Sequence, residues 1–244
     1  MAGAPQTVPA EKDIWLAEGS EKRVAVREMF DEIAPSYDLL NAILSLRMHH
    51  RWRAFAVRKL SLKPGGAALD VCCGTGDFMN PLRKAVGPDG HVFGMDFSLP
   101  MLEMAKQKGY SSLAGADACR LPVRSASVEA VTVGWGIRNV PDPDLAHREI
   151  ARALKPGGRF VSLDMALPRN KAAAWGSNLI CGKLVPWIGS LFGRRRAYTY
   201  LPKSTQRFIS REALIESMKR AGFVDVGCKD LFFGNICLHW GTKP

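Results

Sequence analysis

The sequence predicts an α/β fold: a seven-stranded, mostly parallel, doubly wound sheet with helices on both faces and an N-terminal helical extension. Short apolar runs alternate with helical stretches from residue 67 onward. A glycine-rich turn at 74–76 joins the first run to the first helix of this series. Because parallel neighbours need a long crossover, usually a helix, alternation at this spacing indicates a parallel sheet. The length of 244 residues fits one large domain and is short for two.

Each expected strand is a short apolar run that stops at a polar residue or a turn. Five runs form the parallel part of the sheet, and two last runs face each other across Gly234. The helices between them are expected to end near residues 86, 108, 154 and 221, and Ser98 caps the second. The strands are predicted at residues 67–71, 91–95, 112–115, 128–134, 159–164, 224–228 and 235–240.

Two further segments precede or interrupt this alternation. Residues 21–60 have two apolar helical faces separated by Pro35, so they predict N-terminal helices, preceded by a flexible tail over 1–20. Residues 168–200 contain two Trp, many aliphatic side chains and three consecutive Arg, and they predict a lid or interface insertion. We expect a single domain over 21–244.

The composition argues against several classes of protein. No run approaches the roughly 20 apolar residues that a membrane span needs, and the first residues lack the basic start and apolar core of a secretory signal. We therefore expect a cytoplasmic protein. The six cysteines form no CxxC pair and no Cys/His grouping with the spacing of a zinc site, so no metal is expected.

The net charge of +11 is concentrated in one segment. Residues 169–220 hold eleven Lys and Arg against two Asp and Glu, whereas the rest of the chain holds 23 against 21. Such a segment indicates an anionic partner, either a phospholipid surface or nucleic acid. Because Trp, aliphatic and Arg side chains favour the lipid interface, we expect transient, peripheral contact with an anionic membrane. The alternative is packing on the domain itself or on a second subunit, as in a homodimer.

A cofactor loop is predicted where the first strand meets the first helix. Asp70, Gly74 and Gly76 stand there, and glycines let backbone N–H groups approach a ligand closely. Asp96 ends the second strand, where a carboxylate can accept both hydroxyls of a ribose. These residues together predict a nucleotide-like cofactor.

S-adenosylmethionine suits this loop better than a dinucleotide does. Met79 stands three residues after Gly76, where a dinucleotide fingerprint needs a small side chain. Asp77 would repel a pyrophosphate but suits a ligand that carries a sulfonium and an ammonium. Asp117, followed by Ala118, comes after the third strand, where its carboxylate would accept from the exocyclic amine of adenine. A turn or helix-cap carboxylate is the alternative for Asp117.

Four stretches in order along the chain resemble one known family. The four stretches are Tyr37-Asp38-Leu39-Leu40-Asn41 with Ser45, His49 and Trp52; residues 136–140; residues 197–201 with Ser204; and Leu238-His239-x-Gly241-x-Lys243. Over residues 24–243 the chain is similar to class I methyltransferases, and more narrowly to the ubiquinone/menaquinone biosynthesis C-methyltransferase family.

The resemblance implies a class I (Rossmann-like) methyltransferase fold and S-adenosylmethionine as cofactor. Many members carry Ser where this chain has Gly134, so only backbone groups are expected to contact the cofactor there. Cys72-Cys73 resembles the menaquinone branch more than the ubiquinone branch. The expected cofactor site consists of Gly74, Thr75, Gly76, Asp96, Phe97, Asp117, Ala118 and Gly134.

Three residues are expected to be catalytic: Arg138, Asn139 and Tyr37. Arg138 and Asn139 follow the fourth strand, at the end where α/β sheets bind ligands. Since Arg138 keeps its proton near neutral pH, it would stabilise a phenolate or polarise a water, and a structural ion pair is its alternative. Tyr37 would relay a proton, and a packed aromatic is its alternative. His49 and His50 could act as a base, but packing or capping is the favoured interpretation of His49.

The substrate implied by the resemblance is a polyprenyl quinol that is methylated on a ring carbon. Demethylmenaquinol is favoured, and a ubiquinone-pathway benzoquinol, or both quinols, is the alternative. An RNA methyltransferase is a more distant alternative, because no RNA-binding module or base-stacking platform is visible; we expect no nucleic-acid partner. A binding protein that has lost its chemistry is also compatible with the sequence.

Overall fold

The computed structural model describes residues 19–180, 187, 200, 203–206, 208 and 210–244. Seven strands form one sheet in the order β3-β2-β1-β4-β5-β7-β6. The first five strands are parallel, whereas β7 runs antiparallel to both β5 and β6. The predicted fold class is confirmed. The strands are β1 (Ala67–Val71), β2 (His91–Asp96), β3 (Leu113–Gly115), β4 (Val128–Gly134), β5 (Leu154–Met165), β6 (Val224–Leu231) and β7 (Ile236–Thr242).

The strand order reverses between β1 and β4. β1 pairs with β2 on one side and with β4 on the other, with Val71 opposite both Met95 and Val133. The chain therefore leaves β1 and β4 in neighbouring positions but proceeds toward opposite edges of the sheet. In open α/β sheets the crevice at such a reversal, outside the carboxyl ends of the strands, is where ligands bind.

Helices cover both faces of the sheet, and alternate residues of β1 show the two sides. Ala68 packs into a cluster with α3 and α4, whereas Leu69 and Val71 pack into a cluster with α6 and α10. This alternation follows from the period of two in a strand. The helices of these two layers are α3 (Met48–Lys59), α4 (Met79–Val86), α6 (Pro143–Ala153) and α10 (Arg211–Arg220).

Strand β5 begins five residues earlier than the sequence predicts. Its first residue, Leu154, pairs with Val128, and pairing resumes only at Arg159 opposite Ala130. Residues 155–158, which lie between the predicted helix and the predicted strand, are thus an irregularity inside the strand. Gly157 in the left-handed region (φ +75°) lets the backbone bulge there.

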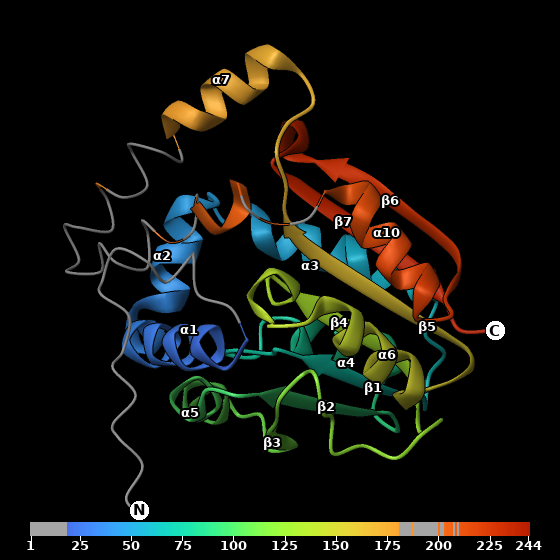
Figure 1. Ribbon diagram of the computed structural model, residues 1–244. Coiled ribbons are helices and arrows are strands. Elements are labelled where there is room, and N and C mark those ends of the chain that lie inside the picture. Colours follow the sequence, from blue (N-terminus) through green and yellow to red (C-terminus); the bar gives the residue numbers. More distant parts are fainter. Residues whose placement is uncertain (1–18, 181–186, 188–199, 201–202, 207, 209) are drawn as a thin grey trace, which may run out of the picture.

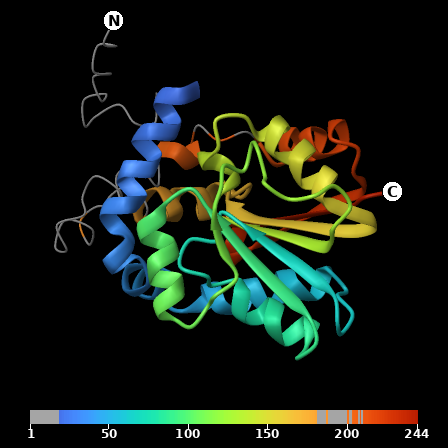
Figure 2. The same ribbon diagram turned by 90° about the horizontal axis from the view of Figure 1, so that it is seen from below.

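The N-terminal helices lie across the carboxyl ends of the parallel strands (Figure 1). They are α1 (Gly19–Ile33), the short η2 (Ala34–Ser36) and α2 (Tyr37–Leu44). Figure 2 shows α1 alongside α5 (Leu99–Gln107), and buried side chains of α1, α2 and α5 form a third apolar cluster. The ammonium of Lys22 fastens α1 to the loop after β4, because it donates to the carbonyls of Arg138 (3.1 Å) and Val140 (3.0 Å).

The insertion is described only in part. Helix α7 (Lys171–Leu179) projects from the end of β5, and none of its residues is buried. The expected tail over 1–20, apart from its last two residues, and the three arginines 194–196 lie outside the described residues. Within the described part of the chain, no helix is both long and apolar enough to cross a membrane.

Phe160 in β5 provides a test of this packing. Its side chain is fully buried, with ring centroids 5.7 Å from His147 and 5.6 Å from Phe223. Phe160→Ala should lower the free energy of unfolding by about 3–5 kcal/mol, because the cavity left between sheet and helices cannot close fully. Urea denaturation measures the loss. The control Val224→Ala, on a side chain 44% exposed, should change it by less than about 0.5 kcal/mol; equal losses would contradict the assignment of the core.

Candidate active site

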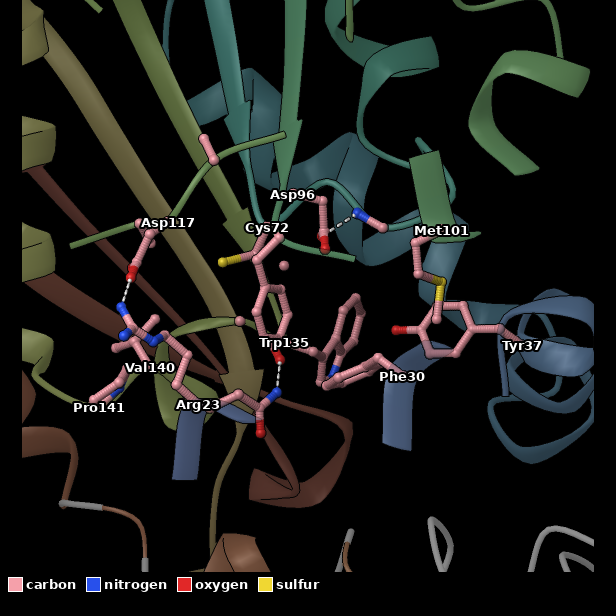
Figure 3. A pocket seen from close by; sticks show the side chains of 17 residues that line it. Arg23, Phe30, Tyr37, Cys72, Asp96, Met101, Asp117, Trp135, Val140 and Pro141 are labelled. Carbon is pink, nitrogen blue, oxygen red and sulfur yellow. Dashed lines mark hydrogen bonds and ion pairs between the residues drawn. The ribbon is translucent and has the colours of Figure 1, made fainter. Parts of the chain in front are cut away.

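A cavity lies at the reversal point, between the ends of β1, β2 and β4 and the helix α1 (Figure 3). Its walls are mainly aromatic and aliphatic, with two carboxylates among them. The structure brings together most of the residues predicted from sequence for this site. Those that line the cavity are Tyr37, Gly74, Asp96, Phe97, Asp117, Ala118, Gly134 and Asn139.

Asp96 is held at the end of β2 by backbone amides. Its carboxylate accepts from the N–H of Gly74 (2.8 Å) and the N–H of Ser98 (2.9 Å). Burial raises the pKa of this carboxyl to about 6, although the amide hydrogen bonds oppose the shift. A carboxylate has about four acceptor sites, so Asp96 keeps acceptor capacity toward the cavity.

Asp117 stands across the cavity from Asp96, with α1 beside it. One oxygen accepts from the N–H of Cys119 (2.8 Å), which is the turn role that the sequence left open. The other oxygen forms an ion pair with Arg23 of α1 at 2.9 Å (Figure 3). Arg23 carried no sequence signal, because nothing links a residue of α1 to the loop after β3 before the chain folds.

The loops after β1 and β4 are packed against each other. Cys72 directly follows β1, and Trp135 directly follows β4. Both residues have left-handed backbones (φ 55°), and both line the cavity. A Cβ added to Gly136 would lie 2.5 Å from the Cβ of Cys72, and one added to Gly134 would lie 2.7 Å from the ring of Phe78. Only glycine fits at these approaches, so the structure explains why no serine side chain occupies position 134.

Two predicted cofactor residues, Thr75 and Gly76, do not line this cavity. The hydroxyl of Thr75 donates to Asp38 of α2 (2.6 Å) and accepts from Lys108 (3.0 Å). Gly76 lies against the ring of Tyr110 instead. Thr75 nevertheless lines a small pocket that shares four lining residues with the first cavity, so its contact with the cofactor stays a prediction.

Asp77, predicted to suit a cationic ligand, lies among cationic side chains. Its side chain does not reach the first cavity but pairs with Arg53 (3.0 Å), His49 (3.5 Å) and Lys108 (3.4 Å). Burial by itself would raise its pKa, but the nearby His49 and the charges of Arg53 and Lys108 outweigh burial and hold the pKa well below its usual range. Asp77 is therefore an ionised anchor for neighbouring cations. It also lines a small pocket that adjoins the first cavity, so its contact with the cofactor stays a prediction.

A second, larger cavity adjoins the first. Phe30, Tyr37 and Trp135 line both and form the wall between them. The second cavity is bounded by α1, α2, α3, α7 and the turn η5 (Phe232–Gly234), and its lining is predominantly apolar. Its polar and charged members include Asn41, His49, Arg53, Arg138 and Asn235.

Arg138 and Asn139 lie in the short helix η3 (Ile137–Asn139) and face different cavities. Arg138 lines the second cavity and forms a buried ion pair with Asp164 of β5. Asn139 lines the first cavity, where its amide donates to the carbonyl of Trp135 (2.9 Å) and accepts from the hydroxyl of Tyr200 (3.0 Å). The structural ion pair that the sequence left open for Arg138 is present, and the guanidinium also borders the cavity.

Tyr37 begins α2 and lies on the wall between the cavities (Figure 3). Its ring packs edge-on against Phe30, with centroids 6.2 Å apart. Burial raises the pKa of the phenol, so Tyr37 keeps its proton at neutral pH. It can act as a hydrogen-bond donor there, and it also fulfils the packed-aromatic alternative.

These contacts fit S-adenosylmethionine and do not fit a pyrophosphate. Two carboxylates face an otherwise largely apolar space, which suits hydroxyl and amine donors on a cationic ligand. Among the described residues that line the first cavity the only cation is Arg23, and Asp117 pairs with it. A pyrophosphate would meet the two carboxylates with little positive charge to offset them.

The model of the ubiE/COQ5 methyltransferase family matches residues 17–243. The chain belongs to this family. As a ubiE/COQ5 family member with the class I fold and a fitting cavity, it is an S-adenosylmethionine-dependent methyltransferase.

Curated relatives match over nearly their whole length. A demethylmenaquinone methyltransferase from Geobacillus kaustophilus is 37% identical over 233 residues, which cover 91% of this chain and 98% of the relative. A demethylmenaquinone methyltransferase from Staphylococcus aureus is 38% identical over 233 residues, covering 93% and 97%.

Solved structures support the fold. A SAM-dependent methyltransferase from Thermotoga maritima is similar with a TM-score of 0.66 and 21% identity, covering 89% of this chain and 99% of that one. The [4+2]-cyclase SpnF is similar with a TM-score of 0.64 and 20% identity, covering 90% and 95%. Since one of these two is named a cyclase, similarity at this level shows architecture and not chemistry.

Sequence reasoning missed several residues of the ubiE/COQ5-type site. Trp135 and Gly136 directly follow β4, so the rule that selected Arg138 and Asn139 could also have included them.

A grouping of Cys228, Cys237 and His239 on the β6–β7 hairpin, with ligand atoms within 4.8 Å of one another, could not be predicted from the spacing of these residues in the sequence. None of the three lines either cavity, and the absence of a metal stays a prediction.

The raised pKa of Asp96 predicts how cofactor affinity depends on pH. The carboxylate is ionised above about pH 6 and becomes a weaker acceptor for hydroxyls as pH falls through that value. The Kd for S-adenosylmethionine, measured by calorimetry, should be constant from pH 8 to 7 and weaken by up to about tenfold per unit below 6. Asp96→Asn should bind weakly and without this pH dependence.

The comparison with Asp96→Asn is needed because Asp70, with a pKa raised to about 7 by burial, titrates nearby. Wild-type affinity in Asp96→Asn, or the same loss of affinity at low pH, would contradict the role of Asp96.

Proposed function

We propose that this methyltransferase methylates a ring carbon of a polyprenyl quinol and converts demethylmenaquinol to menaquinol. The observation that carries the proposal is the shared wall of Phe30, Tyr37 and Trp135. On one side lies a cavity with two carboxylates, and on the other a larger apolar cavity. A polar methyl donor and a hydrophobic acceptor therefore have separate, adjoining sites.

The first cavity would hold the cofactor, which when bound supplies an electrophilic methyl group. Asp96 would accept the ribose hydroxyls and Asp117 the adenine amine. Gly134 would contribute backbone groups, because Phe78 leaves no room for a side chain there. Holding both reactants in adjoining cavities contributes by alignment, which is worth up to about 7–11 kcal/mol in ideal cases.

The second cavity would hold the quinol ring and the start of its tail. The ring carbon becomes nucleophilic only when the neighbouring hydroxyl loses its proton, so the enzyme must favour the quinolate. Arg138 borders this cavity as a permanent cation, and Asp164 fixes its orientation. Tyr37 and Asn139 would contribute hydrogen bonds from the wall between the two cavities and from the first cavity.

The naphthoquinol is favoured over a benzoquinol because the curated relatives at 37–38% identity are named demethylmenaquinone methyltransferases. The Cys72-Cys73 pair supports the same choice. In the structure Cys72 packs against Gly136 at the first cavity, so the pair belongs to the cofactor side of the site.

Methyl transfer from labelled S-adenosylmethionine to reduced demethylmenaquinol in detergent tests the proposal. A 2-polyprenyl-methoxy-benzoquinol and tRNA run in parallel. We expect label in the naphthoquinol alone, because the relatives share that substrate name. Label in both quinols would extend the substrate range. Label in neither quinol, with cofactor binding intact, would contradict the proposed substrate, and label in tRNA would point to a nucleic-acid methyltransferase.

We further propose that the enzyme takes its quinol from an anionic membrane through the rim of the second cavity. Leu44, Ile180 and Phe232 line that cavity from α2, α7 and η5. Large apolar side chains in these elements or directly after them are exposed to solvent, which is costly without a partner. They are Leu39, Ile43, Leu46, Trp175, Leu179, Ile180, Phe232 and Phe233. We call these eight residues the apolar rim.

Replacing Trp175 and Phe233 of the apolar rim with Ser should weaken binding to vesicles of mixed phosphatidylglycerol and phosphatidylcholine by tenfold or more. These side chains are 72% and 81% exposed, and full burial of one aromatic contributes roughly 1.5–3 kcal/mol. Vesicle co-sedimentation measures the change. The control Phe93→Ser, an exposed aromatic of β2 away from the rim, should bind as wild type; equal binding by all three proteins would remove the rim from membrane contact.

A further inference from the structure

His49 of α3 is a buried side chain whose role the cofactor and quinol contacts above do not explain. Only 4% of the residue is exposed, and it lines the second cavity. Its Nε2 has no hydrogen-bond partner within the part of the chain that the structure describes. Buried polar atoms are almost always satisfied, so an unpartnered one beside a cavity calls for a ligand group.

The neighbours of Nδ1 determine which ring nitrogen carries the hydrogen. Nδ1 makes its closest contact with the guanidinium of Arg53, one turn along α3, and lies 3.5 Å from the carboxylate of Asp77. A guanidinium only donates hydrogen bonds. Nδ1 therefore accepts from Arg53, and the neutral imidazole carries its hydrogen on Nε2.

The position of Arg53 is itself tightly determined. It pairs with Asp77 at 3.0 Å and stacks over the ring of Trp135, 4.6 Å from its centroid. Asp77 is in turn held by Lys108, which reaches it from the end of α5. The imidazole is thus anchored through Arg53 to the aromatic that separates the two cavities, and Nε2–H lies on the opposite edge of the ring from this anchor.

His49 lies at the end of the second cavity that is next to the cofactor cavity. Tyr37, Arg53 and Trp135 line that end, and Tyr37 and Trp135 also border the cofactor cavity. A donor at His49 therefore faces the quinol ring rather than its tail.

We propose that Nε2–H of His49 donates a hydrogen bond to the quinol oxygen next to the carbon that is methylated; this inference rests on the proposed function. The hydroxyl proton passes to water, and the O–H electron pair stays on oxygen as a quinolate. His49 keeps its own proton throughout. A fixed donor aimed at developing negative charge in a largely apolar cavity stabilises that charge strongly.

Replacements that keep or remove a donor at Nε2 test this role. Gln places an amide N–H near the position of the imidazole Nε2, whereas Asn is too short and Ala has no donor. His49→Ala and His49→Asn should lower kcat for demethylmenaquinol by about 10²–10³-fold, as for other oxyanion donors. His49→Gln should stay within about tenfold of wild type. The Kd for S-adenosylmethionine and the melting temperature identify any variant that is merely misfolded.

The control is His50→Gln, since His50 is the exposed neighbour of His49 and lines neither cavity. It should keep wild-type kcat. His49→Gln as slow as His49→Ala would overturn the proposal and indicate a proton acceptor instead, and His49→Ala at wild-type speed would overturn it outright. A wild-type enzyme that methylates neither quinol would overturn the proposed function together with this inference.

Discussion

The pairing of β1 with β4 is the contact on which both cavities depend. The register places Val71 opposite Val133, so the two chain segments that leave these strands emerge side by side. Gly136 then packs against Cys72 at a distance that no larger residue allows. Beneath them the hydroxyl of Thr132 donates to the buried carboxyl of Asp70 (2.6 Å) and ties the strands together. Every group of the site is positioned relative to this pair of loops.

The N-terminal helices form part of the site. Lys22 holds α1 to the carbonyls of the loop that carries Arg138, and Arg23 neutralises Asp117 across the cavity. Phe30 and Tyr37 supply two of the three residues in the wall between the cavities. A sheet with its crossover helices alone would leave the crevice open to water, where charges interact weakly.

Buried charges are concentrated beside the second cavity. Arg138 with Asp164, and Arg53 with Asp77, are ion pairs whose side chains are 15% exposed or less. Burying such pairs costs more desolvation energy than apolar residues of the same volume would. These pairs lie next to the proposed quinol site. Their position there explains why the desolvation cost is tolerated, because fixed cations and their anchored neighbours favour a quinolate over a quinol.

The local pattern of the chain was enough to predict the strands, their parallel order and the residues at their ends. Strand β4 was predicted to the residue, and Asp96, Asp117 and Gly134 were placed at the cavity, because strand ends and glycine turns are local features. The predicted start of β5 was wrong, because the bulge near its start depends on pairing with the neighbouring strand β4.

Side-chain direction in the loops was decided only by tertiary contacts. Thr75 and Asp77 were predicted to meet the cofactor, but the sequence did not show that Asp38, Lys108 and Arg53, which belong to other helices, also hold their side chains. The same is true of His49, for which packing was the favoured interpretation and which acquires an unpartnered nitrogen at a cavity only when α3 meets the loop after β1. A residue type and its spacing determine which groups are available, whereas partners from distant parts of the chain determine where those groups point.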